Sequence, residues 1–275
     1  MRLHQQFREA MGTRFEVFLH GDDEEHLEAV AVAVLDEIVR LDDVLSRFNP
    51  GSEVARVNRE AGQRPVRVDR EVFALLERCE QARQWTGGHF DVTASTGGNG
   101  FKLDADRSTV QFTRPDVMID LGGIGKGYAL DCGREILLRF GVKRGLLQGG
   151  TSSVLAVGAP FGANGWPVDV RHPLRTGAEA VTRVELMNRG FSCSAVRHPD
   201  QAQSDVVNPL LREPLAGNAA CVVLAASAAD AEIFSTALLA MGRLRAADYL
   251  ENRLDPDLTV GWFESDCGFA WIRSA

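Results

Sequence analysis

The chain has 275 residues, 45% of them hydrophobic and 25% charged, a composition typical of a globular protein with a sizeable buried core. Its 38 acidic residues outnumber the 30 basic ones, and the formal charge of -8 argues against a nucleic-acid partner, which requires a basic surface. The five cysteines are scattered and never form a C-x-x-C pair, so we expect neither a disulfide framework nor a cysteine zinc site.

The first half of the chain begins with a predicted strand followed by a long helix. Residues 13–21 alternate in polarity and end in glycine, as a strand and turn would. An acidic first turn and apolar residues at helical spacing predict a helix over 23–48. A second helix is predicted over 69–88, where two glycines end it, and short strands over 108–113 and 117–123.

The second half repeats the mixture of strands and helices. Helices are predicted over 128–141, 228–242 and 246–254, and strands over 145–159, 166–173, 180–195 and 219–227, followed by two terminal strands. The order lacks regular βαβ alternation. We therefore predict an α+β fold with mixed or antiparallel sheets and packed helices, in one compact domain over 1–275.

The stretch "VMIDLGGIGKGYALD" at 117–131 combines glycines with one lysine before a predicted helix. It is not a P-loop, because Gly127 follows Lys126 where a Ser or Thr must hold magnesium. It is not a dinucleotide fingerprint either, since its last three glycines alternate strictly. The pattern indicates a strand that delivers Asp120, a turn open to close approach of a ligand, and a helix N-terminus. A plain tight turn is the alternative.

This stretch resembles the "D-L-G-G-I-A-K-G-Y-A-x-D" signature of the ApbE family, the FAD:protein FMN transferases. Five further blocks resemble the family in the same order: "MGTRFEV" at 11–17, "LSRFNPGSEVARVN" at 45–58, "GGHFDVTA" at 87–94, "QGGTSSVLAVG" at 148–158 and "AEIFSTALLAMG" at 231–242. The resemblance implies a T-fold-related ApbE domain. It also implies binding of FAD and Mg²⁺ and transfer of FMN to a Thr or Ser of a partner flavoprotein, with release of AMP.

The resemblance implies a set of metal ligands: the backbone carbonyl of Gly125 and the side chains of Glu232 and Thr236. The i, i+4 spacing of Glu232 and Thr236 places both oxygens on one helical face, as a hard cation requires. The family usually carries Asp at the Glu232 position, and the extra methylene still lets the carboxylate reach an ion. The alternative is a solvated glutamate beside a packing threonine.

The resemblance also implies the residues that hold FAD. Met11, Phe15 and Phe48 correspond to residues placed against the flavin ring. The other implied contacts are His89, Phe90, Asp91, Asp120, Lys126, Gly149, Gly150 and Thr151. From the residues alone, the alternative roles are a core aromatic for Phe15, an exposed loop residue for His89 and a plain turn for the two glycines.

Asp120 and Asp205 are the catalytic residues that the resemblance implies. Asp205 stands where the family has a histidine suited to proton transfer at the acceptor hydroxyl, and an ordinary carboxylate is a weaker base. Asn208 replaces the family aspartate that follows, and both segments 95–108 and 204–215 depart from the family pattern. These departures leave two alternatives open: an FAD pyrophosphatase that yields FMN and AMP, or a catalytically weak flavin-binding protein.

Two expectations concern the partner and the location of the protein. The chain lacks an Asp-x-x-[Ser/Thr]-Ala-Thr segment of the kind that these transferases modify, so we expect it not to be its own acceptor. No apolar signal segment starts the sequence, and no stretch is long enough to span a bilayer. We therefore expect a cytoplasmic protein without a membrane segment.

Overall fold

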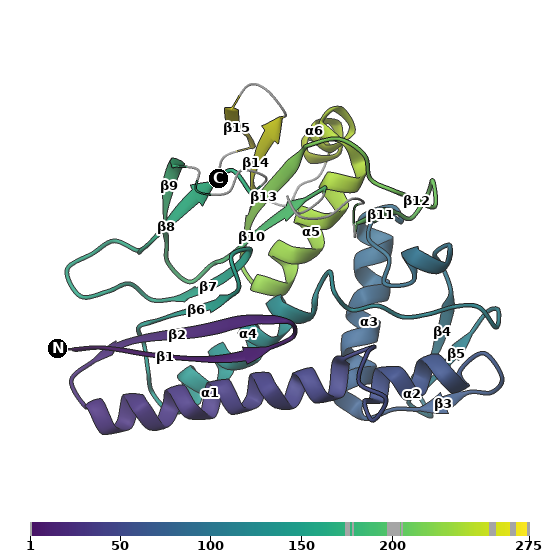
Figure 1. The fold of residues 1–275 in the computed structure, drawn as a ribbon, viewed down its shortest axis with the longest axis horizontal. Coiled ribbons are helices and arrows are strands. Elements are labelled where there is room, and N and C mark those ends of the chain that lie inside the picture. The colour runs from purple at the N-terminus through teal and green to yellow at the C-terminus, as the bar shows by residue number, and fades with distance from the viewer. Residues whose placement is uncertain are drawn as a thin grey trace.

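The computed structural model describes residues 2–173, 177, 179–196, 204, 206–252, 257–264 and 268–273. At its centre is an antiparallel sheet in which neighbouring strands follow the order β1-β2-β6-β7-β10-β13-β14-β15 (Figure 1). The strands are β1 Arg2–Ala10, β2 Thr13–Gly21, β6 Gly145–Gly149, β7 Ser153–Val157, β10 Gly190–Ala195, β13 Ala220–Ala225, β14 Thr259–Glu264 and β15 Gly268–Arg273.

Three helices cross one face of this sheet in succession: α1 below β1 and β2, α4 below β6 and β7, and α5 beside β10 and β13 (Figure 1). The helices are α1 Glu24–Leu45, α2 Glu53–Glu60, α3 Arg70–Trp85, α4 Gly125–Arg139, α5 Ala228–Met241 and α6 Arg243–Glu251. Between α4 on one side and α6 on the other, α5 has twelve of its fourteen residues buried. This enclosure explains why its sequence is apolar nearly all round.

Smaller elements complete the structure. The hairpin of β8 (Trp166–Arg171) and β9 (Ala180–Leu186) packs Trp166, Val170 and Leu186 on the other face of the main sheet. A three-stranded sheet lies beside α2 and α3 (Figure 1). The remaining elements are β3 Val66–Arg67, β4 Phe101–Asp104, β5 Thr109–Phe112, the 3-10 helix η1 Ala94–Thr96, β11 Val207–Asn208 and β12 Glu213–Pro214.

The predicted α+β class with antiparallel sheets and packed helices is confirmed. The strand predicted over 117–123 is wrong, because its first five residues have no regular secondary structure and pair with no strand, and a turn follows. Strand β1 and helix α2 were not predicted. Among the described residues, no helix is both long and apolar enough to cross a bilayer.

Candidate functional site

Two cavities, each about 380 Å³, share Asp120, Gly122 and Lys126 as wall residues. The first chamber is lined by the loop after α3, by the end of β10 and by Glu232 and Thr236 of α5. The second chamber is lined by the β1–β2 turn, the C-terminal end of α1 and the start of α4. Cofactor pockets typically occupy about 300–1,000 Å³, so the joined chambers are large enough for a dinucleotide.

Asp120 is held at the junction by contacts outside any sheet. Asn58 of α2 donates from Nδ2 to the carbonyl of Ile119 (3.0 Å) and accepts from the Ile119 N–H (2.8 Å). The Asp120 N–H then donates to the carbonyl of Val92 at 2.7 Å. At the side chain, Oδ1 accepts from the Gly122 N–H and Oδ2 lies 3.1 Å from Nε of Arg47. Asp120 therefore faces both chambers in a fixed position.

Glu232 projects from the first turns of α5 toward the start of α4. The residue is only 3% exposed. Oε2 accepts from the Gly127 N–H at 2.8 Å, and Oε1 accepts from Ser153 Oγ at 2.5 Å and lies 3.1 Å from Lys126 Nζ. A buried carboxylate needs such partners, and here a cation and two donors supply them.

Gly127 allows the two helices to approach closely at this point. A Cβ atom at Gly127 would lie 2.5 Å from the carbonyl oxygen of Ala228, so any larger residue would push α4 away from α5. The helices are also joined through Asp131, whose carboxylate accepts from the N–H groups of Ala228 (3.0 Å) and Ala229 (3.1 Å). This junction fixes Glu232 against the glycine stretch.

Thr236 lies one turn beyond Glu232 in the wall of the first chamber. Its hydroxyl is 3.2 Å from Ser194 Oγ, which is itself 2.7 Å from Ser235 Oγ. A Cβ atom at Gly123 would lie 3.8 Å from Thr236 Oγ1, so the glycine turn passes directly beside this hydroxyl. Glu232 and Thr236 thus share one helical face as predicted, next to the stretch that contains Gly125.

Met11 and Phe48 both line the second chamber. Met11 and Gly12 form the two-residue β1–β2 turn with positive φ values of 49° and 69°, and the Met11 N–H donates to Asp42 of α1 at 2.7 Å. Phe48 is 78% exposed, with the Arg47 guanidinium 4.2 Å from its ring centroid. The chamber therefore presents an apolar face beside a cation.

The structure corrects the interpretation of Phe15. Its ring has no exposed surface and lies in the main core, because β2 directs it under the sheet, so it has no face free for a flavin. Gly149 is needed there for space, since its Cβ atom would lie 2.9 Å from that ring, and Gly150 adopts a positive φ of 62° beside Thr13. Neither glycine nor the exposed Thr151 lines a chamber.

The loop after α3 presents His89, Phe90 and Asp91 to the first chamber. Asp91 also holds the loop together, since Oδ1 accepts from the Thr93 N–H and hydroxyl and Oδ2 accepts from the Asn99 N–H at 2.6 Å. Phe90 is buried, and its ring edge lies 3.3 Å from a Cβ atom placed at Gly123. Phe90 thus packs under the glycine turn.

The remaining sequence predictions concern the two segments that depart from the family. Asp205 lies outside the described residues, whereas Val206, Val207 and Pro209 beside it line the first chamber. Asn208 is structural, because Nδ2 donates to the carbonyl of Ala240 and Oδ1 accepts from two backbone N–H groups of the next turn. Segment 95–108 contains strand β4 and leads into β5.

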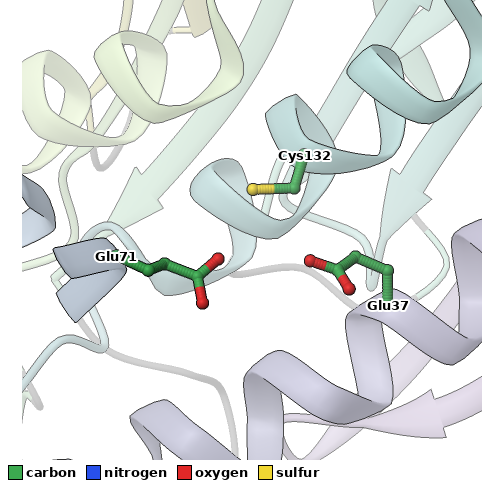
Figure 2. Close-up of side chains that lie close together, drawn as sticks. All are labelled: Glu37, Glu71 and Cys132. Atoms are coloured by element: carbon green, nitrogen blue, oxygen red, sulfur yellow. The ribbon is translucent and has the colours of Figure 1, made fainter. Parts of the chain in front are cut away.

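A second cluster of titratable groups lies outside both chambers. Figure 2 shows Glu37 of α1, Glu71 of α3 and Cys132 of α4 pointing toward one another. Arg40 donates to both carboxylates, at 2.7 Å and 2.8 Å, and burial raises the pKa of the Cys132 thiol to about 11. The cluster is therefore an ion-paired contact between helices, with its thiol protonated at neutral pH.

Sequence reasoning missed Arg47 and the serines of the site. Arg47 pairs with Asp120, and its position next to Phe48 in the second matched block was the available signal, since an acidic protein needs local positive charge to hold an anion. Ser153 hydrogen-bonds to Glu232, while Ser192 and Ser194 line the first chamber. No local pattern marks these serines, because only the pairing of β7 and β10 brings them together.

Comparison with known proteins identifies the family of this chain. The sequence matches the profile of the ApbE family over residues 11–99 and 94–260. It is 24% identical to a FAD:protein FMN transferase of Klebsiella pneumoniae over 265 residues, which covers 84% of this chain and 82% of that relative.

Two solved structures share the fold. The ApbE protein of Thermotoga maritima superimposes with a TM-score of 0.87 at 21% identity, covering 98% of this chain and 97% of the other. The flavinyl transferase ApbE of Pseudomonas stutzeri gives a TM-score of 0.84 at 20% identity, covering 98% and 93%. The profile match spans well over half of the residues, and the same fold runs through nearly the whole chain. This chain belongs to the ApbE family.

Proposed function

We propose that this protein is a FAD:protein FMN transferase. A Thr or Ser hydroxyl oxygen of a partner protein forms a bond to the FMN phosphorus of FAD. The pyrophosphate bond breaks, AMP leaves with the bonding electron pair, and the hydroxyl proton passes to a base. The names of the relatives and the form of the two chambers support this proposal.

The observation that carries the proposal is the junction between the chambers. FAD has two ring systems joined by an anionic pyrophosphate, and the chambers meet at Lys126, with Arg47 in the wall of the second. We assign the flavin ring to the second chamber, beside Met11 and Phe48, and the nucleotide to the first. The glycine turn at the junction leaves room for the pyrophosphate to approach the backbone.

We also propose Mg²⁺ as the metal, held by Glu232, Thr236 and the carbonyl of Gly125. This all-oxygen set fits a hard cation, and Mg²⁺ commonly uses one or two carboxylates together with substrate phosphates and water. When bound, the ion would neutralise charge on the pyrophosphate. The Lys126 ammonium carries the positive charge beside Oε1 of Glu232 in this structure, so it must withdraw from that oxygen to admit the ion.

The test is incubation with FAD, Mg²⁺ and a peptide containing Asp-x-x-Thr-Ala-Thr. We expect the peptide to gain the mass of FMN less water, with an equal amount of AMP released and no adduct on the enzyme chain. Glu232→Ala should abolish transfer, whereas Glu28→Ala, at an exposed position of α1, should not. Free FMN with AMP would identify a pyrophosphatase instead, and unchanged bound FAD a binding protein.

A further inference from the structure

His89 carries a ring nitrogen without a partner in the wall of the first chamber. Its Nδ1 lies 3.0 Å from the carbonyl oxygen of Thr86. A carbonyl only accepts, so Nδ1 bears the hydrogen, and in the neutral ring Nε2 bears the lone pair. Nε2 is buried and has no hydrogen-bond partner among the described residues. Leaving a buried polar atom unpaired costs stability, and such an atom at a chamber wall points to a ligand group.

The turn that carries His89 is firmly anchored. Thr86 is 1% exposed, its hydroxyl donates to the Ala82 carbonyl at 2.8 Å and accepts from the Phe90 N–H at 3.0 Å. Gly87 and Gly88, both with positive φ, bring the chain back from the end of α3. The imidazole is therefore oriented by backbone contacts on both sides of His89.

The other titratable groups in this wall already have partners or are protonated. Both oxygens of Asp91 accept hydrogen bonds, Asp120 faces Arg47, and Glu232 pairs with Lys126. Burial raises the pKa of Cys193 to about 12. The Nε2 atom is thus the one unpaired basic atom that the described part of this wall offers.

Because the ring hydrogen is on Nδ1, only a group that donates a hydrogen bond can pair with Nε2. Phosphate oxygens of FAD have no hydrogen to donate, so the neutral ring does not pair with the pyrophosphate. A hydroxyl does donate. We infer that Nε2 of His89 accepts the proton of the acceptor Thr or Ser hydroxyl as its oxygen bonds to the FMN phosphorus and AMP leaves. This inference rests on the proposed transferase function. Histidine suits the role because a neutral imidazole accepts a proton directly at its unprotonated ring nitrogen.

The test compares His89→Gln with Asp205→Asn and with the surface control His26→Gln, measuring FAD affinity and kcat for FMN transfer. We expect His89→Gln to lower kcat by about 10²–10⁴-fold, with FAD affinity within about threefold of wild type, and His26→Gln to change neither. Added imidazole should restore activity to His89→Ala, because it supplies the missing ring nitrogen from solution.

Each contrary outcome is distinct. Unchanged kcat in His89→Gln overturns the inference, above all if Asp205→Asn abolishes transfer. Parallel losses of kcat and FAD affinity make His89 an FAD ligand and also overturn it. Nitrogen NMR of the ligand-free protein should show the Nδ1–H tautomer of His89, and the Nε2–H tautomer contradicts the inference without any assay. A wild type that does not cleave FAD overturns the proposed function itself.

Discussion

The ammonium of Lys126 lies 3.1 Å from Oε1 of Glu232, so the first turn of α4 supplies the cation for a carboxylate buried on α5. The Lys126 side chain is 24% exposed and the Glu232 side chain 4%. Because Glu232 is shielded from solvent, loss of the pair should change the free energy of unfolding measurably. Because the Lys126 side chain is partly exposed, its ammonium can exchange partners.

Lys126→Met should destabilise the metal-free protein by about 1–3 kcal/mol, because Glu232 keeps two hydrogen bonds but loses its cation. Urea denaturation measures this change. Adding Glu232→Gln to Lys126→Met should recover part of the loss, giving a coupling energy in the double-mutant cycle. Lys102→Met, at an exposed position of β4, is the control. Strictly additive effects would show that the contact carries no energy.

The same variant tests the metal assignment. In Lys126→Met no ammonium competes with Mg²⁺ for Oε1 of Glu232. Mg²⁺ should therefore raise the melting temperature of this variant more than that of the wild type. Thermal scans over a Mg²⁺ series measure the difference. An equal response in both proteins would place the ion away from Glu232.

Asn58→Ala should misplace Asp120. It removes two hydrogen bonds to Ile119, at a cost of about 1–3 kcal/mol, and frees the backbone just before the catalytic candidate. We expect weaker FAD binding and slower transfer, measured by fluorescence titration and by the peptide assay. Asn164→Ala, at an exposed position between β7 and β8, should change neither. A stability loss with normal FAD binding would mean that Asp120 is positioned by Arg47 and Val92 alone.

Replacing Asp131 by Asn should change the free energy of unfolding by an amount that depends on pH. Burial raises its pKa, and the hydrogen bonds from Ala228 and Ala229 only partly oppose this. Between its ordinary pKa of about 4 and the raised folded value, the folded state binds more protons than the unfolded state, so the stability contributed by this group falls as pH rises. The free energy of unfolding of wild type minus that of Asp131→Asn should decrease across this interval. An increase would contradict the direction of the shift.

Three thiols should resist alkylation in the native protein. Burial raises the pKa of Cys79 and Cys193 to about 12 and that of Cys132 to about 11. Each unit lowers the thiolate fraction tenfold, so Cys132 should react with iodoacetamide at pH 8 about a hundredfold more slowly than a free thiol. Mass spectrometry of peptides, before and after denaturation, measures each site. Equal rates in both states would show that Cys132 is accessible.

Much of the fold followed from local patterns. The helix over 228–242 is predicted within a residue because its apolar sequence starts after Ser227, which caps it, and stops at Gly242. The metal-ligand set implied by the family resemblance likewise predicted that Glu232 lies beside the glycine stretch, where it accepts from the Gly127 N–H.

The contacts that complete the site were not predictable, because they join segments far apart in sequence. Asn58 of α2 hydrogen-bonds to both backbone groups of Ile119, and this side chain, rather than a neighbouring strand, pairs with the middle of the expected strand over 117–123. For Phe15, by contrast, the sequence predicted a ligand contact that the structure does not have. Its match to a ligand-contacting aromatic says nothing about which side of the sheet it faces, and the pairing of β2 with β6 sends it into the core.

The enclosure of α5 limits how this site can change. Glu232 and Thr236 lie on a helix packed between the main sheet, α4 and α6, so its amide hydrogens exchange only when the centre of the protein opens. Any shift of the α5 backbone would disturb its packing against the main sheet, α4 and α6. Under the proposed function, selectivity for acceptor proteins should vary in segments 89–95 and 206–209, which also line the first chamber.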